Sequence, residues 1–213
     1  MKKTITSLLI LLLLSTVACF QGEQNRTSPA NDDTLSVEAG DDELMEVKII
    51  QFDTITVSIL LPKDWEIIYY NGGPDLPHVE QSYTFEIYPS TGDALGLVTV
   101  GNTMRDDVLS EEEFGLWFSS FTERFLPFSV EETAEVTNYS LRNGYGVLSI
   151  FTDAALVGTI PPPDEYLYLG LFLGSWGDGF VLHSSLLSNE IDSFEMTLML
   201  LALMHISFSH NIL

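Results

Sequence analysis

Polar and apolar residues alternate along much of the chain after residue 46, in the manner of half-buried β-strands. Asp53-Thr54 separates the first two of these runs and predicts a tight hairpin between them. A further extended apolar stretch, residues 65–70, ends at the turn-forming sequence Asn71-Gly72-Gly73-Pro74. We therefore expect four short strands in the first half of the domain. The strand-like runs are residues 47–52, 55–61, 82–88 and 95–100.

A helix is predicted next, because the spacing of the apolar positions changes. Ser110 and Glu113 have the spacing of a capping box, in which the serine hydroxyl accepts from the backbone amide three residues on. The helix should end before Pro127, which cannot continue it. Its aromatic residues fall on one face, and we expect them to enter the core rather than to form a ligand site. They are Phe114, Trp117, Phe118, Phe121 and Phe125.

The second half of the domain again predicts four strands. Arg142-Asn143-Gly144 lies between the first two, and Asn-Gly is a strong hairpin signal because both residues tolerate the positive φ of a type I′ turn. A wider, glycine-rich loop, residues 174–179, separates the last two. The strand-like runs are residues 134–141, 145–152, 166–173 and 180–187.

A final helix follows, capped by Ser188 or Asn189, and its run from 194 to 206 is apolar nearly all round. At about 13 residues it is too short to span a bilayer, so we expect a core helix packed across a sheet, with membrane embedding as the alternative. The order ββββ-α-ββββ-α predicts one α+β domain over residues 46–213. Its antiparallel sheet should have about seven to eight strands and two covering helices.

The N-terminus has the three parts of a signal peptide, predicted to be residues 1–18. Lys2 and Lys3 precede an unbroken apolar run from Leu8 to Leu14, and small residues follow it. The apolar segment, residues 5–20, has 16 residues, whereas a helix needs about 20 to cross a bilayer comfortably. Cleavage is therefore favoured over anchoring.

The segment Ser15 to Cys19 resembles the lipoprotein box of bacteria, in which small residues precede a cysteine that is acylated and becomes the mature N-terminus. The resemblance implies cleavage between Ala18 and Cys19 and lipid on Cys19 that holds the protein at a membrane. Thr16 replaces the usual leucine, which leaves an ordinary secretory signal or an uncleaved anchor as alternatives. Phe20 is not the aspartate of an inner-membrane retention signal, so we expect the outer membrane if the cell has one.

The next segment, residues 19–45, is polar, acidic and poor in large apolar residues. We expect a disordered tether that spaces the domain from the lipid surface. The whole chain carries 31 acidic and 8 basic residues, a formal net charge of −23. Such a charge repels phosphate backbones, so nucleic acid is not expected as a partner. The charge serves solubility or, as the functional alternative, a cationic partner or weakly bound cations.

The sequence Ile59-Leu60-Leu61-Pro62-Lys63-Asp64-Trp65 resembles the strand, Pro-Lys-Gly-Trp turn and strand near the start of the PsbP/DcrB-like fold family. The later hairpin that ends in residues 170–185, followed at once by an apolar helix, agrees with that family's order of elements. Asp64 replaces the usual glycine, a small departure because aspartate also tolerates turns. The resemblance implies an accessory or binding role, often in an exported lipoprotein, and no shared catalytic residues.

No catalytic, cofactor-binding or metal-binding residues are predicted. Gly174-Ser175-Trp176-Gly177 lacks the glycine spacing of a nucleophile elbow. The acidic clusters lack the spacing of a calcium loop, and the lone Cys19 excludes an intrachain disulfide and a multi-cysteine metal site. His183 falls on a predicted strand, where we expect a sheet residue with its hydrogen bonds satisfied rather than a base.

We therefore expect a non-catalytic binding or accessory role at the cell envelope, with the membrane and an envelope protein as partners. The alternative is an exported small-ligand carrier or hydrolytic enzyme, which a deep pocket with polar groups around His183 would favour. Trp176, in its glycine-rich loop, is the candidate for an exposed aromatic contact with the partner.

Overall fold

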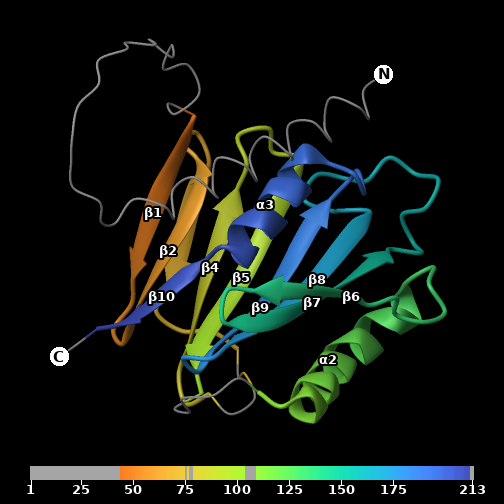
Figure 1. Ribbon diagram of the computed structural model, residues 1–213. Coiled ribbons are helices and arrows are strands. Elements are labelled where there is room, and N and C mark those ends of the chain that lie inside the picture. Colours follow the sequence, from red (N-terminus) through yellow and green to blue (C-terminus); the bar gives the residue numbers. More distant parts are fainter. Residues whose placement is uncertain (1–43, 75, 77–78, 104–108, 212–213) are drawn as a thin grey trace, which may run out of the picture. The chain divides into compact units, whose positions relative to one another are not determined.

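The computed structural model describes residues 44–74, 76, 79–103 and 109–211 (Figure 1). Residues 42–213 form one compact unit. In the described residues this unit has ten strands, two α-helices and one short 3-10 helix. In chain order they are β1 (Met45–Gln51), β2 (Ile55–Pro62), β3 (Glu66–Tyr70), β4 (Ser82–Tyr88), β5 (Ala94–Asn102), α2 (Glu111–Phe125), η1 (Leu126–Phe128), β6 (Thr137–Leu141), β7 (Gly144–Thr152), β8 (Tyr168–Trp176), β9 (Phe180–Ser188), α3 (Phe194–Met204) and β10 (Ser207–His210).

The strands form two sheets, both antiparallel throughout. The large sheet has the order β3-β4-β5-β9-β8-β7-β6, and the small sheet has the order β1-β2-β10. The α+β class with two helices is confirmed, but the single sheet of seven or eight strands is wrong. The hairpin of β1 and β2 does not join the large sheet, because the chain turns at Lys63 and Asp64 and β3 begins a new one.

Helix α2 covers one face of the large sheet over β7, β8 and β9. Its capping box is confirmed: the Glu113 amide donates to Ser110 Oγ at 3.3 Å, and the Ser110 amide donates to Glu113 Oε2 at 2.9 Å. The predicted aromatic stripe enters the core, with Phe114, Trp117 and Phe118 buried. They pack against residues of the three strands and of two loops. The buried partners are Leu76, Leu109, Val147, Phe151, Leu171, Leu173 and Val181.

The opposite face of the large sheet packs against α3 and the small sheet. Figure 1 shows α3 lying across the strands of the large sheet, beside the small one. Two glycines permit this close approach, because a Cβ on Gly96 or Gly170 would lie 2.8 Å from Met199 Sδ or Met196 Cε. Helix α3 buries Met196, Leu198, Met199, Ala202 and Leu203, so the prediction of a core helix is confirmed.

Strand β10 was not predicted. It pairs with β2, from Ser207 opposite Ser58 to His210 opposite Ile55, and in Figure 1 lies beside the orange hairpin. Asn211 extends the pairing, because its amide donates to Thr54 O at 3.0 Å and its side chain donates to Phe52 O at 2.6 Å. The strand is short and its partner is distant in sequence, so the local pattern holds no sign of it.

Two predicted helix and turn details are wrong. The N-cap of α3 is Ser193, whose hydroxyl accepts from the Met196 amide, whereas Ser188 is the last residue of β9. In the hairpin between β6 and β7, only Asn143 has a positive φ, of 63°. Gly144 begins β7 instead, where a Cβ would lie 2.1 Å from the carbonyl oxygen of Ser175. Glycine is needed there for close approach and not for turn geometry.

Candidate functional site

In the half of the large sheet formed by β3, β4 and β5, the face that carries α2 elsewhere is open at one end only. At the other end Thr84 and Thr99 are buried, and Gly73 of the segment before β4 lies close to both. Ile68, Glu86 and Leu97 lie opposite one another on these three strands, and because side chains alternate along a strand they share this face. Ile68 is 39% exposed and Leu97 is 37% exposed. Tyr70, two residues along β3, is also exposed. We call Ile68, Tyr70, Glu86, Tyr88 and Leu97 the open patch.

Two phenols hold the carboxylate in this patch. The hydroxyl of Tyr70 donates to Glu86 Oε2 at 3.2 Å, and the hydroxyl of Tyr88 donates to the same oxygen. The hydrogen bond to Glu86, followed by burial, raises the pKa of Tyr88 to about 12. Both effects favour the protonated phenol, so Tyr88 remains a hydrogen-bond donor across the physiological pH range.

The surroundings of the open patch are acidic. Burial, and then the charges of Asp164 and Asp93, raise the pKa of Tyr166, which in turn acts on Tyr88. Within the described part of the chain, no ion pair joins Glu86 to a basic residue. The patch therefore combines apolar side chains, aromatic rings and a fixed negative charge.

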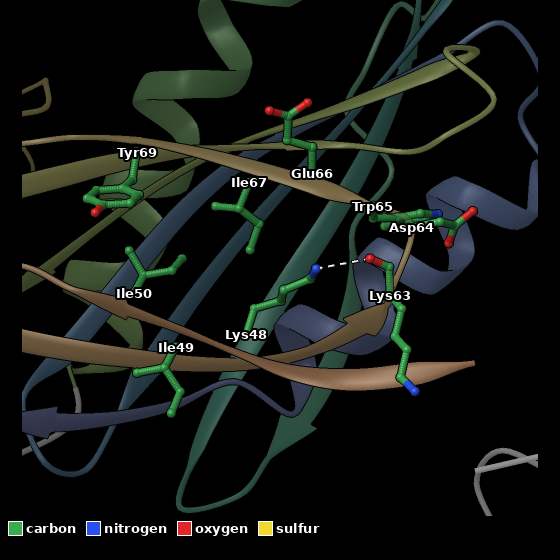
Figure 2. Close-up of a pocket in the computed structure, with 9 residues that line it drawn as sticks. All are labelled: Lys48, Ile49, Ile50, Lys63, Asp64, Trp65, Glu66, Ile67 and Tyr69. Carbon is green, nitrogen blue, oxygen red and sulfur yellow. Dashed lines mark hydrogen bonds between the residues drawn. The ribbon is translucent and has the colours of Figure 1, made fainter. Parts of the chain in front are cut away.

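A groove of about 470 Å³ lies between β1 and the segment 63–69, which includes most of β3. Figure 2 shows Ile50 and Ile67 facing each other between the strands, while Lys48 reaches from β1 toward the carbonyl of Lys63. Lys48 Nζ donates to that oxygen at 3.2 Å and also pairs with Glu46. The ring of Phe52, directly after β1, contacts the Tyr69 ring edge to face, with centroids 5.9 Å apart.

A second groove, of about 460 Å³, lies between α2 and β6. It is mostly apolar, and its floor is part of the core beneath α2. Its lining residues are Phe114, Gly115, Phe118, Ser119, Val136, Asn138, Tyr145 and Val147.

His183 lies on β9 beneath α2, as a sheet residue. Its ring stacks on Phe121, with centroids 4.2 Å apart and 19° between the planes. The expectation that its hydrogen bonds are satisfied is wrong, because the buried Nε2 atom has no hydrogen-bond partner among the residues that the structure describes. Burial, and then the charge of Arg124, lower the pKa of His183 to about 4. The ring is therefore neutral at physiological pH, and it lines neither of the two grooves.

Trp176 is not the exposed contact that the sequence suggests. It is the last residue of β8, only 4% exposed, and its ring meets Phe208 of β10 with centroids 5.0 Å apart. The hairpin loop is shorter than expected, residues 177–179, with Gly179 at a φ of 81°. A tight turn leaves Trp176 on the strand, where alternation directs it to the face that the small sheet covers.

Several predicted positions lie outside the described residues. They include Ala18 and Cys19 of the cleavage and lipidation site, the tether up to residue 43 and the acidic cluster at 106–107. Among the residues that the structure does describe, no group of three or more His, Cys, Asp or Glu side chains could hold a metal ion. No helix in that part of the chain has both the length and the apolar character that crossing a membrane requires.

The sequence did not reveal the open patch. The alternation in β4 already separates Thr84, Glu86 and Tyr88 from Tyr83, Phe85 and Ile87, so a polar face was visible. What the sequence lacks is the pairing of β4 with β3 and β5, which brings Ile68 and Leu97 beside Glu86.

Comparison of the chain with models of protein families, with curated proteins and with solved structures finds no match.

Proposed function

We propose that this chain is an exported lipoprotein of the cell envelope whose domain binds a protein partner without catalysing a reaction. Cleavage after Ala18 would leave lipid on Cys19 to hold the domain at the membrane, the outer one if the cell has two. Support for this part comes from the basic, apolar and small-residue segments that lead up to Cys19.

The open patch is the observation that carries the binding role. Large apolar side chains that are exposed together on a sheet face mark an interaction surface more often than scattered ones do. The Glu86 carboxylate, which makes no ion pair with a basic residue in the described part of the chain, favours a partner that brings a positive charge. Aromatic rings beside it favour the same partner, because a lysine or arginine side chain gains energy over their faces. We therefore propose a partner segment that presents lysine or arginine among apolar residues.

A catalytic role has less support from the geometry. His183, the histidine that the alternative hydrolytic role would use, lies against the Phe121 ring and lines neither of the two grooves described above. A general base must come within hydrogen-bonding reach of the proton that it abstracts. The buried position of this ring favours a structural role in the packing of α2.

Kinship with the PsbP/DcrB-like family is part of the proposal. It rests on the sequence from Ile59 to Trp65, which spans the end of β2, the turn and the residue before β3. The order of the elements, with an apolar helix directly after the β8–β9 hairpin, is compatible with it. An accessory lipoprotein is the role that such kinship implies.

Photo-crosslinking in intact cells tests the binding role. A photoreactive residue at Leu97, in the open patch, should capture a protein that the same residue at Leu116, exposed on α2, does not. Glu86→Gln should reduce the yield at Leu97 severalfold, because it removes the charge. Equal capture at both positions, or a co-purifying small molecule and no protein, would contradict the binding role.

A separate experiment tests the anchor. Cys19→Ser should abolish acyl labelling and release the protein from the membrane fraction, whereas Ser15→Ala should do neither. Membrane association and acyl labelling that both survive Cys19→Ser would overturn the lipoprotein proposal and leave the binding role standing.

A further inference from the structure

Four strands of the described structure have one unpaired edge: β1, β3, β6 and β10. Strand β1 is the longest of them, with seven residues against five, five and four. Proteins usually protect such edges with proline, bulges, charges or short length, since a free edge is a template for another strand. Strand β1 has no proline, and its register with β2 is unbroken from Met45 to Gln51. Its two charges, Glu46 and Lys48, are of opposite sign and so can pair with those of a second strand.

The hydrogen bonds that flank β1 show which of its backbone groups are free. The Lys63 amide donates to Leu44 O at 3.0 Å, and the Phe52 amide donates to Ile55 O at 2.9 Å. In an antiparallel pair, residues that exchange hydrogen bonds alternate with residues that do not. The even-numbered residues of β1 therefore bond to β2. The four odd-numbered residues of β1 direct their backbone N–H and C=O groups away from β2. They are Met45, Val47, Ile49 and Gln51.

The outer face of β1 is apolar and exposed. Val47 is 60% exposed and Ile49 is 64% exposed, and Leu60 of β2, opposite Val47, is also exposed. On the inner face Lys48 points into the groove (Figure 2), and Glu46, two residues before it on the same face, pairs with it. The edge thus has one apolar face and one face with two opposite charges two residues apart.

We propose that β1 pairs with β1 of a second copy of this chain, antiparallel, with Val47 on the two-fold axis. In this register Glu46 of each copy lies opposite Lys48 of the other, which gives two oppositely charged pairs. Met45 of each copy likewise lies opposite Ile49 of the other. Opposite charges directly across a strand pair stabilise it, and like charges destabilise it. A centre at Lys48 or at Glu46 would set like charges against each other, and a centre at Ile49 would leave Lys48 opposite isoleucine.

The local charge permits this contact in spite of the net charge of −23. The described residues include four basic side chains, and two of them, Lys48 and Lys63, lie at this edge. Charges farther away than about 8 Å are largely screened at physiological ionic strength. A two-fold contact is also self-complementary, so both apolar faces continue into one surface across the new pair.

Sedimentation of the full chain carrying Cys19→Ser tests the pairing. We expect a concentration-dependent dimer, about tenfold or more weakened by Lys48→Glu, because that change sets like charges against each other at both ends of the contact. The double variant Glu46→Lys with Lys48→Glu should restore the dimer, because it exchanges the two charges. Lys63→Glu, the same charge change beside the strand, should have a much smaller effect.

Two further variants test the edge and the register. Val47→Pro should abolish the dimer while leaving the monomer folded, because its amide faces away from β2. Val47→Cys should form an intermolecular disulfide across the axis, whereas Gln51→Cys should not. A protein that is monomeric at every concentration, or a dimer that Val47→Pro and Lys48→Glu leave intact, would overturn the proposal. Failure of this dimer would leave the open patch and its partner unaffected.

Discussion

The two halves of one face of the large sheet have similar side chains but different neighbours. Leu171 and Leu173 on β8 are fully buried beneath α2, whereas Leu97 on β5 is 37% exposed on the same face. A helix about 10 Å across covers only two or three strands that lie about 4.8 Å apart. One helix on a seven-stranded sheet therefore leaves β3, β4 and β5 to other cover. The segment before β4 lies over Thr84 and Thr99, and Leu97 stays exposed beyond the reach of both the segment and α2.

Removal of a leucine side chain should distinguish the covered half of the sheet from the open patch, and it gives the largest expected effect on stability. Leu173→Ala should lower the free energy of unfolding by about 3 kcal/mol, because it opens a cavity beneath α2. Leu97→Ala, the matched change in the open patch, should lower it by less than about 0.5 kcal/mol. Urea unfolding measures both values. Equal losses would show that the open patch is covered in solution.

Lowering the pH should lower the free energy of unfolding through His183, which lies in the covered half. The folded pKa of His183, about 4, lies below its ordinary value of 6.5, so folding favours the neutral ring. Its contribution is fully present above pH 6.5 and is lost as the pH falls from 6.5 toward 4, by about 3 kcal/mol at most. Unfolding at several pH values, compared with His183→Gln, isolates this loss. His205→Gln, at the exposed end of α3, should follow the wild type.

The covering helix itself depends on its first turn. Ser110→Ala should lower the free energy of unfolding by about 1 kcal/mol, since it leaves the Glu113 amide without its acceptor. Ser110→Asp should stay close to the wild type, because aspartate also caps helices. A loss of the same size in both variants would mean that the hydroxyl, and not the cap, matters.

The smallest effect is expected in the open patch. Tyr88→Phe removes a hydrogen bond to a partly exposed carboxylate, and water can replace the donor, so stability should change by less than about 0.5 kcal/mol. Ser175→Ala on the covered half should cost about 1–3 kcal/mol, because it leaves the buried amide of Leu109 unpaired. Thermal unfolding of the two variants side by side checks this order.

The sequence predicts local structure well where one short pattern determines it. Period-two alternation locates β4, and Ser110 with Glu113 locates the start of α2. The pattern does not say which strands become neighbours. The division into two sheets and the strand β10 depend on pairing between distant segments, and no local periodicity encodes that.

The candidate site residues likewise divide into those that a local pattern determines and those that depend on pairing between distant segments. The glycines around Trp176 suggest an exposed loop, but β8 continues three residues beyond the predicted end at 173 and directs the Trp176 ring inward. The open patch could not be predicted, because it exists only when β3, β4 and β5 lie side by side. The burial of the aromatic stripe of α2 was predictable, because helical spacing alone gathers those rings on one side.

The pairing of β10 with β2 also bears on the order in which parts of the domain fold. The contacts of Asn211 with Phe52, Thr54 and Thr56 join segments more than 150 residues apart. Contacts of such long range slow folding, because the intervening chain must be ordered first. In a chain that emerges from its N-terminus, the edge of β2 that pairs with β10 would stay unpaired until residues 207–210 arrived. The small sheet should therefore be the last part of the domain to form, which pulse-labelled hydrogen exchange can resolve.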